Sequence, residues 1–382
     1  MEELYNQPIV LDNGSGTIRC GFSTDEAPRV NYSNILGRPK YYKIDYLPSD
    51  INIDDTFVGN HAQLNRGLLK LTYPIEHGTI KDWNSLELIW QQVLLHDLID
   101  NNTNNEISLK EHTMLITEHP FSERRQREKI GELLFETFGL GAINIAIPSV
   151  LSLYSTGRTT GVSIDIGDGV CCVAPIFEGF TLPGSIKRIN IGGRDITKQL
   201  QIELMKDGYS FNSSSEFEIV RNMKERLGFI KQKNDLNEYN KDNDFEKFQL
   251  PDGKSLKVRK QSLNKSCEIL FKPEIYGFEY DKFPNIISDS INSTDMELRG
   301  KFFENIILSG GCTMIKNFGS RILNDLRNID QEIKLKIYSS PERKNNTFMG
   351  GSILSSLSTF NNIVISKKQF MENPECIHDT YF

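Results

Sequence analysis

The sequence lacks several features that would define other classes of protein. No apolar run is long enough to span a bilayer, and the start, Met1–Tyr5, lacks the basic region and apolar stretch of a secretory signal. No Gly-x-x-x-x-Gly-Lys-Ser/Thr motif is present, which excludes a P-loop nucleotidase. The six cysteines include no Cys-x-x-Cys pair, so we expect reduced, mostly buried thiols in the cytoplasm and neither a zinc site nor a disulfide framework.

An excess of positive charge is also absent. The net charge of −7 argues against a broad surface for nucleic acid or anionic membrane, so we expect neither as a partner. The 382 residues exceed the usual length of one domain, and the hydrophobic content of 38% is ordinary for a soluble globular protein. More than one domain, each with a sizeable core, is therefore expected.

One short pattern occurs twice in the chain. Residues Ile9–Ile18 and Val162–Cys171 each consist of an apolar run, an Asp, a Gly-x-Gly and a second apolar run. This order predicts a strand, a tight turn and a returning strand. A single copy is weak evidence for a site, because Asp-x-Gly turns are common in hairpins that bind nothing. Two copies favour two similar domains that hold one ligand between facing hairpins.

The residue types in this pattern suit a nucleotide. Glycines allow positive φ and let backbone N–H groups approach a ligand closely, which suits phosphate oxygens. An Asp at the end of the first strand suits a hydrated Mg²⁺ held on the same phosphates.

Strands and amphipathic helices alternate along the rest of the chain, which predicts α/β sheets with crossover helices. Ser215–Glu218 is predicted to be a helix capping box, and Gly350–Gly351 is predicted to lead into a helix. The polar stretch 101–106 is predicted to be a mobile loop. The polar stretch 231–249 is predicted to be a loop or a small lobe.

Six segments of the chain resemble motifs of the actin family, and the resemblance covers almost the whole length. The segments are Asp12–Gly16, Tyr73–Gly78, Leu151–Gly161, Asp165–Gly169, Ser309–Gly311 and Pro341–Lys344. The resemblance implies an actin-like ATPase fold: two similar α/β domains, a duplicated core, clasp a nucleotide in a central cleft, and each carries a smaller inserted lobe. The first domain would comprise 1–148 plus 350–382, with its lobe at about 37–75. The second would comprise 149–349, with its lobe at about 193–282.

Within the family, three stretches resemble the actin-related subunit of the dynactin filament. They are Asn6–Pro8, Lys81–Asn84 and Gly208–Val220. This resemblance implies self-association into a short filament, contact with other dynactin subunits and, through them, with dynein. It also implies a location in the cytoplasm and cytoskeleton, and a role in microtubule-based transport and in nuclear and spindle positioning.

The resemblance further implies which residues meet ATP or ADP and Mg²⁺. Asp12 and Asp165 would hold Mg²⁺ through water. Contacts to the nucleotide would come from Gly14, Ser15, Gly16, Thr17, Arg19, Gly167, Asp168, Gly169, Val170, Gly193, Lys224, Glu225, Gly310, Gly311, Met314 and Lys344.

Four residues in or near the expected nucleotide site depart from the family pattern. Arg19 replaces a Lys, keeping the charge but offering a planar fork, and Ile315 replaces a Tyr that lines the adenine pocket. Pro148 stands where the family has a Gln, and proline offers no group that orients a water. Cys172 stands where the family has a His, and a thiol is a weak hydrogen-bond former. We therefore expect no catalytic residue at these two positions and slow or absent ATP hydrolysis, unless another residue compensates.

Three other functions remain open at this point. The same family features occur in a divergent conventional actin and in an actin-related subunit of a chromatin complex. The chromatin-complex subunits carry long insertions, which this chain lacks. A sugar kinase or heat-shock ATPase uses a similar duplicated core. A kinase would need a carboxylate base and a sugar site, and no motif here demands either.

Overall fold

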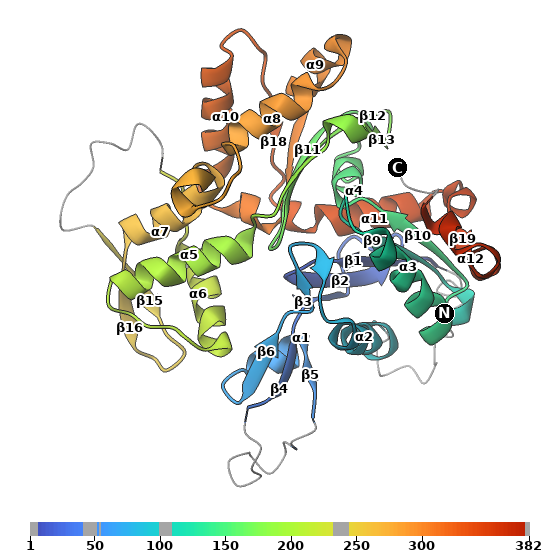
Figure 1. Cartoon of the computed structure of the whole chain (residues 1–382), viewed down its shortest axis with the longest axis horizontal. Coiled ribbons are helices and arrows are strands. Elements are labelled where there is room, and N and C mark those ends of the chain that lie inside the picture. The colour runs from blue at the N-terminus through green and yellow to red at the C-terminus, as the bar shows by residue number, and fades with distance from the viewer. Residues whose placement is uncertain (1–6, 41–51, 53–54, 99–108, 232–243, 379–382) are drawn as a thin grey trace.

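A computed structural model describes residues 7–40, 52, 55–98, 109–231 and 244–378. The predicted loop at 101–106 and part of the stretch 231–249 lie outside these residues. Two six-stranded sheets organise the molecule (Figure 1). None of the helices in the described ranges is long and apolar enough to cross a membrane.

Both predicted hairpins are present, one in each sheet. In the first sheet, strands β1 and β2 are antiparallel, with Asp12 opposite Arg19. In the second, β11 and β12 are antiparallel, with Asp165 opposite Cys172. The order in the first sheet is β19-β10-β9-β1-β2-β3, and in the second it is β13-β12-β11-β17-β18 with β14 beside β12. The bounds are β1 Ile9–Asn13, β2 Thr17–Phe22, β3 Val30–Ser33, β9 Thr113–Thr117, β10 Ala142–Ala146, β11 Gly161–Ile166, β12 Cys171–Phe177, β13 Phe180–Thr181, β14 Lys187–Ile189, β17 Ile306–Ser309, β18 Ile337–Tyr338 and β19 Ile365–Ser366.

The central strands are apolar on both faces because helices cover both faces. In β1, Ile9 and Leu11 belong to one buried cluster, which includes residues of the helical segments 83–98 and 124–138. Val10 points the other way, into a cluster with Leu151 and Phe348. This alternation is the period of two that a strand imposes on its side chains.

Helices α4 (Pro148–Tyr154) and α11 (Asn346–Ser356) connect the two sheets and pack against each other. A Cβ on Gly350 would lie 1.7 Å from the carbonyl oxygen of Leu151, so this crossing requires glycine. Because α11 begins at Asn346, Gly350 and Gly351 lie inside it. The expectation that they precede a helix is wrong. The predicted domain boundaries, after 148 and before 350, fall inside these two helices.

The remaining elements surround this pair of sheets, with β4, β5, β6 and α1 in one projecting lobe and α5, α6, β15 and β16 in another (Figure 1). The hairpin β15–β16 was not expected from sequence. Their bounds are β4 Leu36–Pro39, β5 Phe57–Val58, α1 Gly59–Leu64, β6 Leu69–Thr72, β7 Ile75–Glu76, β8 Thr79–Ile80, α2 Trp83–Gln92, α3 Arg124–Glu132, α5 Gly193–Lys206, α6 Ser214–Leu227, β15 Phe245–Gln249, β16 Ser255–Arg259, α7 Lys260–Cys267, α8 Phe283–Asn292, α9 Met296–Phe303, α10 Phe318–Ile329 and α12 Lys367–Glu372.

The capping box of α6 lies two residues earlier than the sequence suggested. Ser213 is the N-cap: its Oγ accepts from the N–H of Glu216 at 3.2 Å, and the Glu216 carboxylate accepts from the N–H of Ser213 at 2.8 Å. The sequence offers Ser213, Ser214 and Ser215 in a row, so Ser213–Glu216 and Ser215–Glu218 both match the motif.

We predict that Ser213→Ala destabilises the first turns of α6 by about 1 kcal/mol, because the partly buried N–H of Glu216 loses its acceptor. Ser215→Ala is the matched control and should leave the helix unchanged. Hydrogen exchange of the α6 backbone amides measures both. Faster exchange in the Ser215 variant than in the Ser213 variant would restore the original assignment.

Candidate functional site

The turns of the two hairpins meet each other. A Cβ on Gly16 would lie 2.4 Å from Cβ of Asp168, and a Cβ on Gly169 would lie 2.8 Å from Oγ of Ser15. Each turn thus uses a glycine to let the other turn approach, as the pattern of two Gly-x-Gly motifs requires.

Arg194, near the start of α5, joins the two turns. Its Nη2 donates to the carbonyl oxygen of Ser15 at 3.1 Å, and its Nε donates to Oδ2 of Asp168 at 3.1 Å. The guanidinium also lies over the ring of Tyr73, 4.1 Å from its centroid. A buried arginine with partners on both hairpins holds them at a fixed separation.

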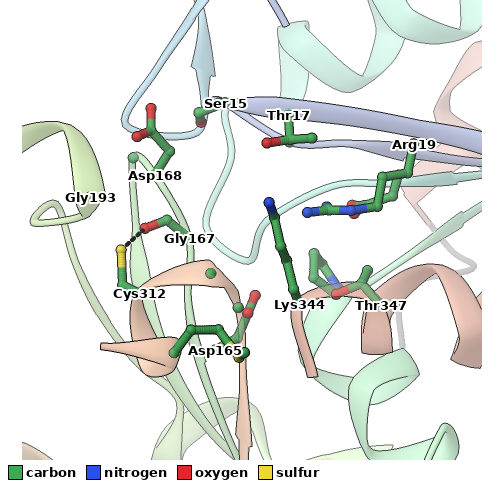
Figure 2. Close-up of a pocket in the computed structure, with 18 of the residues that line it drawn as sticks. Ser15, Thr17, Arg19, Asp165, Gly167, Asp168, Gly193, Cys312, Lys344 and Thr347 are labelled. Carbon is green, nitrogen blue, oxygen red and sulfur yellow. Dashed lines mark hydrogen bonds and ion pairs between the residues drawn. The ribbon is translucent and has the colours of Figure 1, made fainter. Parts of the chain in front are cut away.

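A cavity of about 310 Å³ opens beside this junction. It is within the size range of small-ligand sites. Residues from both sheets and from α5, α6 and the segment before α11 line it (Figure 2). The predicted site residues that line it are Asp12, Gly14, Ser15, Gly16, Thr17, Arg19, Asp165, Gly167, Asp168, Gly169, Gly193, Lys224, Glu225, Gly310, Gly311, Met314 and Lys344.

Val170 is the predicted residue that the cavity lining does not include. Its carbonyl oxygen accepts from the N–H of Gly167 at 2.9 Å, which closes the turn of the second hairpin. Its side chain is buried, with Cγ2 3.0 Å from the place of a Cβ on Gly78. Val170 therefore shapes the turn and does not line the space that the turn encloses.

Two carboxyl groups face the cavity from equivalent places in the two sheets. Asp12 accepts from Nη1 of Arg19 at 2.8 Å and from Oγ1 of Thr117 at 3.0 Å. Burial, together with the nearby Asp12 carboxylate, raises the pKa of Asp165 to about 7, against the lowering effects of Arg19 and Ser309. A divalent cation would relieve this crowding of negative charge. Two carboxylates supply few protein ligands, which suits a cation that keeps most of its water.

Cationic side chains share the cavity with these carboxyl groups. Figure 2 shows Arg19 and Lys344 reaching into the same space, from β2 and from the segment before α11. Nε of Arg19 donates to Oδ1 of Asn345 at 3.1 Å, so this arginine bridges the first hairpin and that segment. Burial lowers the pKa of Lys344. Nζ of Lys224 donates to the carbonyl oxygen of Gly193 at 2.7 Å, which holds α6 against α5 at the cavity wall.

A third glycine turn closes the side of the cavity formed by the second sheet. Gly310 has φ +85°, and a Cβ there would lie 2.3 Å from the carbonyl oxygen of Ile166. Cys312 follows it, and its Sγ donates to the carbonyl oxygen of Gly167 at 3.1 Å (Figure 2). Met314 is 44% exposed, and Ile315 lines the cavity beside it. Met314 and Ile315 thus contribute apolar side chains to this side of the cavity.

Pro148 and Cys172 occupy different surroundings. Pro148 is the first residue of α4 and lines the cavity, where it supplies no donor or acceptor from its side chain. Cys172 is buried against Ala174 and Ile186 and is not part of the lining. Pro148 therefore lines the cavity and Cys172 lies behind the lining, and the absence of a catalytic group at these two positions stays a prediction.

Four lining residues were not expected from the sequence: His119, Arg221, Cys312 and Thr347. His119 lies two residues after the end of β9, so a search of strand ends for polar residues would have found it. The other three lie on helical segments next to predicted site residues, and no motif marks them.

Comparison with known proteins identifies the chain's relatives. The family model described as "Actin" matches residues 3–381. An "Actin-like protein" of Neurospora crassa is 42% identical over 388 residues, covering 100% of this chain and 99% of the relative. "Centractin" of Saccharomyces cerevisiae is 44% identical over 376 residues, covering 97% of this chain and 95% of the relative.

We predict that Gly16→Ala abolishes nucleotide binding, because the added methyl group would force the two hairpins apart. Gly67→Ala is the matched control, since a Cβ there meets nothing within 4 Å. Titration with a fluorescent ATP analogue measures both variants. Equal affinity of the Gly16 variant and the native chain would contradict the packing of the hairpins.

We predict that His119 makes the protein less stable in acid. Burial and the nearby Arg188 lower the pKa of His119 from 6.5 to about 4, although the Asp12 carboxylate acts to raise it. The unfolded chain therefore binds more protons between these values, and stability falls as the pH falls through this window. Between about pH 7.5 and about pH 5, the native chain should lose about 2 kcal/mol more than His119→Gln. Urea denaturation of both proteins measures the difference, and equal losses would refute the assignment.

Proposed function

This chain belongs to the actin family, and we propose that it is a nucleotide-binding filament subunit of the centractin kind. The observation that carries the proposal is the cavity: two Asp-x-Gly-x-Gly hairpins, one from each sheet, meet around it, and cationic side chains lie beside their carboxyl groups. The identity to a centractin over 97% of the chain supports the subgroup. By that likeness, the chain builds the short filament of the dynactin complex, which links dynein to cargo in the cytoplasm.

In this proposal the cavity holds ATP or ADP with Mg²⁺. The glycine turns at 14–17 and 167–169 present backbone N–H groups to phosphate oxygens. Arg19 and Lys344 offset phosphate charge, and Asp12 and Asp165 hold the hydrated cation. The apolar end, with Met314 and Ile315, takes the base.

The bound nucleotide acts mainly as a clamp between the two halves of the chain. A ligand that contacts both sheets binds only the closed arrangement and stabilises it by mass action. Hydrolysis is slow, because positioning of the attacking water dominates this reaction and Pro148 has no group for it. The proposed division into 1–148 with 350–382, and 149–349, puts one hairpin in each half.

The other functions fit the chain less well. A sugar kinase or heat-shock ATPase shares the duplicated core, but the family model over residues 3–381 and the two relatives favour an actin-related protein. A divergent conventional actin would hydrolyse ATP quickly upon assembly, and a chromatin-complex subunit would remain a monomer alone. Assembly and hydrolysis therefore separate the candidates.

We predict that the purified protein forms short filaments of uniform length in Mg²⁺ and ATP. A heterologous contact between identical subunits that does not close into a ring produces such filaments. Negative-stain microscopy measures this, with nucleotide-free protein in EDTA as the control. Stable monomers at high concentration in both conditions would favour the chromatin-complex or kinase alternatives.

We predict that Pro148→Gln raises the rate of single-turnover ATP hydrolysis, because it places an amide in the cavity where a water can be held. Adding Cys172→His should raise it further only if the larger side chain reaches the cavity from its buried position. Native protein hydrolysing as fast as an ordinary actin, with no gain in either variant, would refute slow hydrolysis.

A further inference from the structure

His119 lines the cavity next to Pro148, and the contacts assigned above give it no role. Its Nδ1 is fully buried and meets no hydrogen-bonding partner within the part of the chain that the structure describes. Because Nδ1 is buried, Nε2 is the nitrogen through which the ring can meet the contents of the cavity. An imidazole that lines a cavity and makes no hydrogen bond to the described residues is a polar group that a ligand or a water can bind.

Strand register explains why His119 and Pro148 are neighbours. Strands β10, β9 and β1 are parallel, and Thr117 of β9 pairs with Ala146 of β10. His119 and Pro148 each lie two residues beyond this pair, at the carboxyl edge of the sheet. On the other side, Oγ1 of Thr117 donates to Oδ1 of Asp12 at 3.0 Å. His119 thus lies between Pro148 and the first hairpin, at the edge where ligands bind in α/β sheets.

We propose that His119 positions the attacking water for the slow nucleotide hydrolysis of this chain, in the place that Pro148 leaves without a polar side chain. The inference rests on the proposed nucleotide site. It assigns the slow ATP hydrolysis to His119, which follows β9, whereas Pro148 follows β10.

The surroundings of the ring keep it neutral. A Cβ on Gly78 would lie 3.1 Å from Cδ2 of His119 and 3.2 Å from Nη2 of Arg188, so the ring and the guanidinium flank the same point. Burial and this positive charge lower the pKa of His119 to about 4, and Asp12 opposes the shift only in part. A neutral imidazole can donate or accept a hydrogen bond, which suits a water that must present its oxygen to phosphorus.

The chemical step is hydrolysis of the terminal phosphate. His119 holds the water through Nε2, the water oxygen forms a bond to the γ-phosphorus, and the bond from that phosphorus to the bridging oxygen breaks. The products are the nucleoside diphosphate and inorganic phosphate, and the proton lost by the water is released with the phosphate. Positioning is the main contribution a protein makes to this reaction.

Single-turnover hydrolysis tests the proposal on protein loaded with ATP and Mg²⁺ under assembly conditions. His119→Ala should reduce the rate roughly tenfold or more, and His119→Gln, which retains a group able to hold water, should recover part of it. His61→Ala, which changes an exposed histidine of α1, is the matched control and should keep the native rate. Equal rates in the native chain and His119→Ala would overturn the proposal.

A second measurement reads the ring directly. In protein labelled with ¹⁵N-histidine, the signal lost in His119→Gln identifies His119, and that signal should move when aluminium fluoride is added to the complex with ADP and Mg²⁺. An unmoved signal would overturn the proposal, and this readout decides when turnover is too slow to measure. The affinity for ADP distinguishes failure of the proposed function from failure of the role of His119. Native protein that binds no ADP would refute the proposed function. Tight binding of ADP with an unmoved signal would refute only the role of His119.

Discussion

The contact between the two glycine turns is the constraint on which the rest of the site depends. Neither turn could approach the other with a side chain at Gly16 or Gly169, and Arg194 then fixes their separation through Ser15 and Asp168. Each turn ends a strand in the centre of its own sheet, so the sheets are held with their carboxyl edges facing one cavity. Helices α4 and α11 join the sheets on the other side of this contact, and Gly350 allows their close crossing.

This arrangement concentrates negative charge at a place where a cation would balance it. Asp12 and Asp165 come from equivalent strand ends, and burial, together with the nearby Asp12 carboxylate, raises the pKa of Asp165 to about 7. Arg19 offsets part of this charge by pairing with Asp12. Negative charge is thus concentrated beside the two carboxyl groups, and a bound cation would balance it. A nucleotide bound in such a site would stabilise the fold as well as serve as a substrate.

Much of this could be predicted from sequence because it depends on local rules. The Asp-x-Gly-x-Gly pattern between two apolar runs predicted a hairpin at both places where it occurs, and its repetition predicted two similar domains. The errors came from features that only packing decides. Three adjacent serines left the cap of α6 ambiguous, and Gly350 is tolerated inside α11 because Leu151 approaches there. His119 was missed because its importance depends on the register between β9 and β10, which links residues that are distant in the chain.

The central claim is that nucleotide is held between the two hairpins and is consumed slowly. The most direct measurement is a high-resolution electron cryomicroscopy structure of filaments assembled in ATP and Mg²⁺ and frozen soon after assembly. The account predicts density for an intact triphosphate between the turns of Gly16 and Gly169, with a cation between Asp12 and Asp165. A diphosphate in every subunit, or no nucleotide at all, would contradict it.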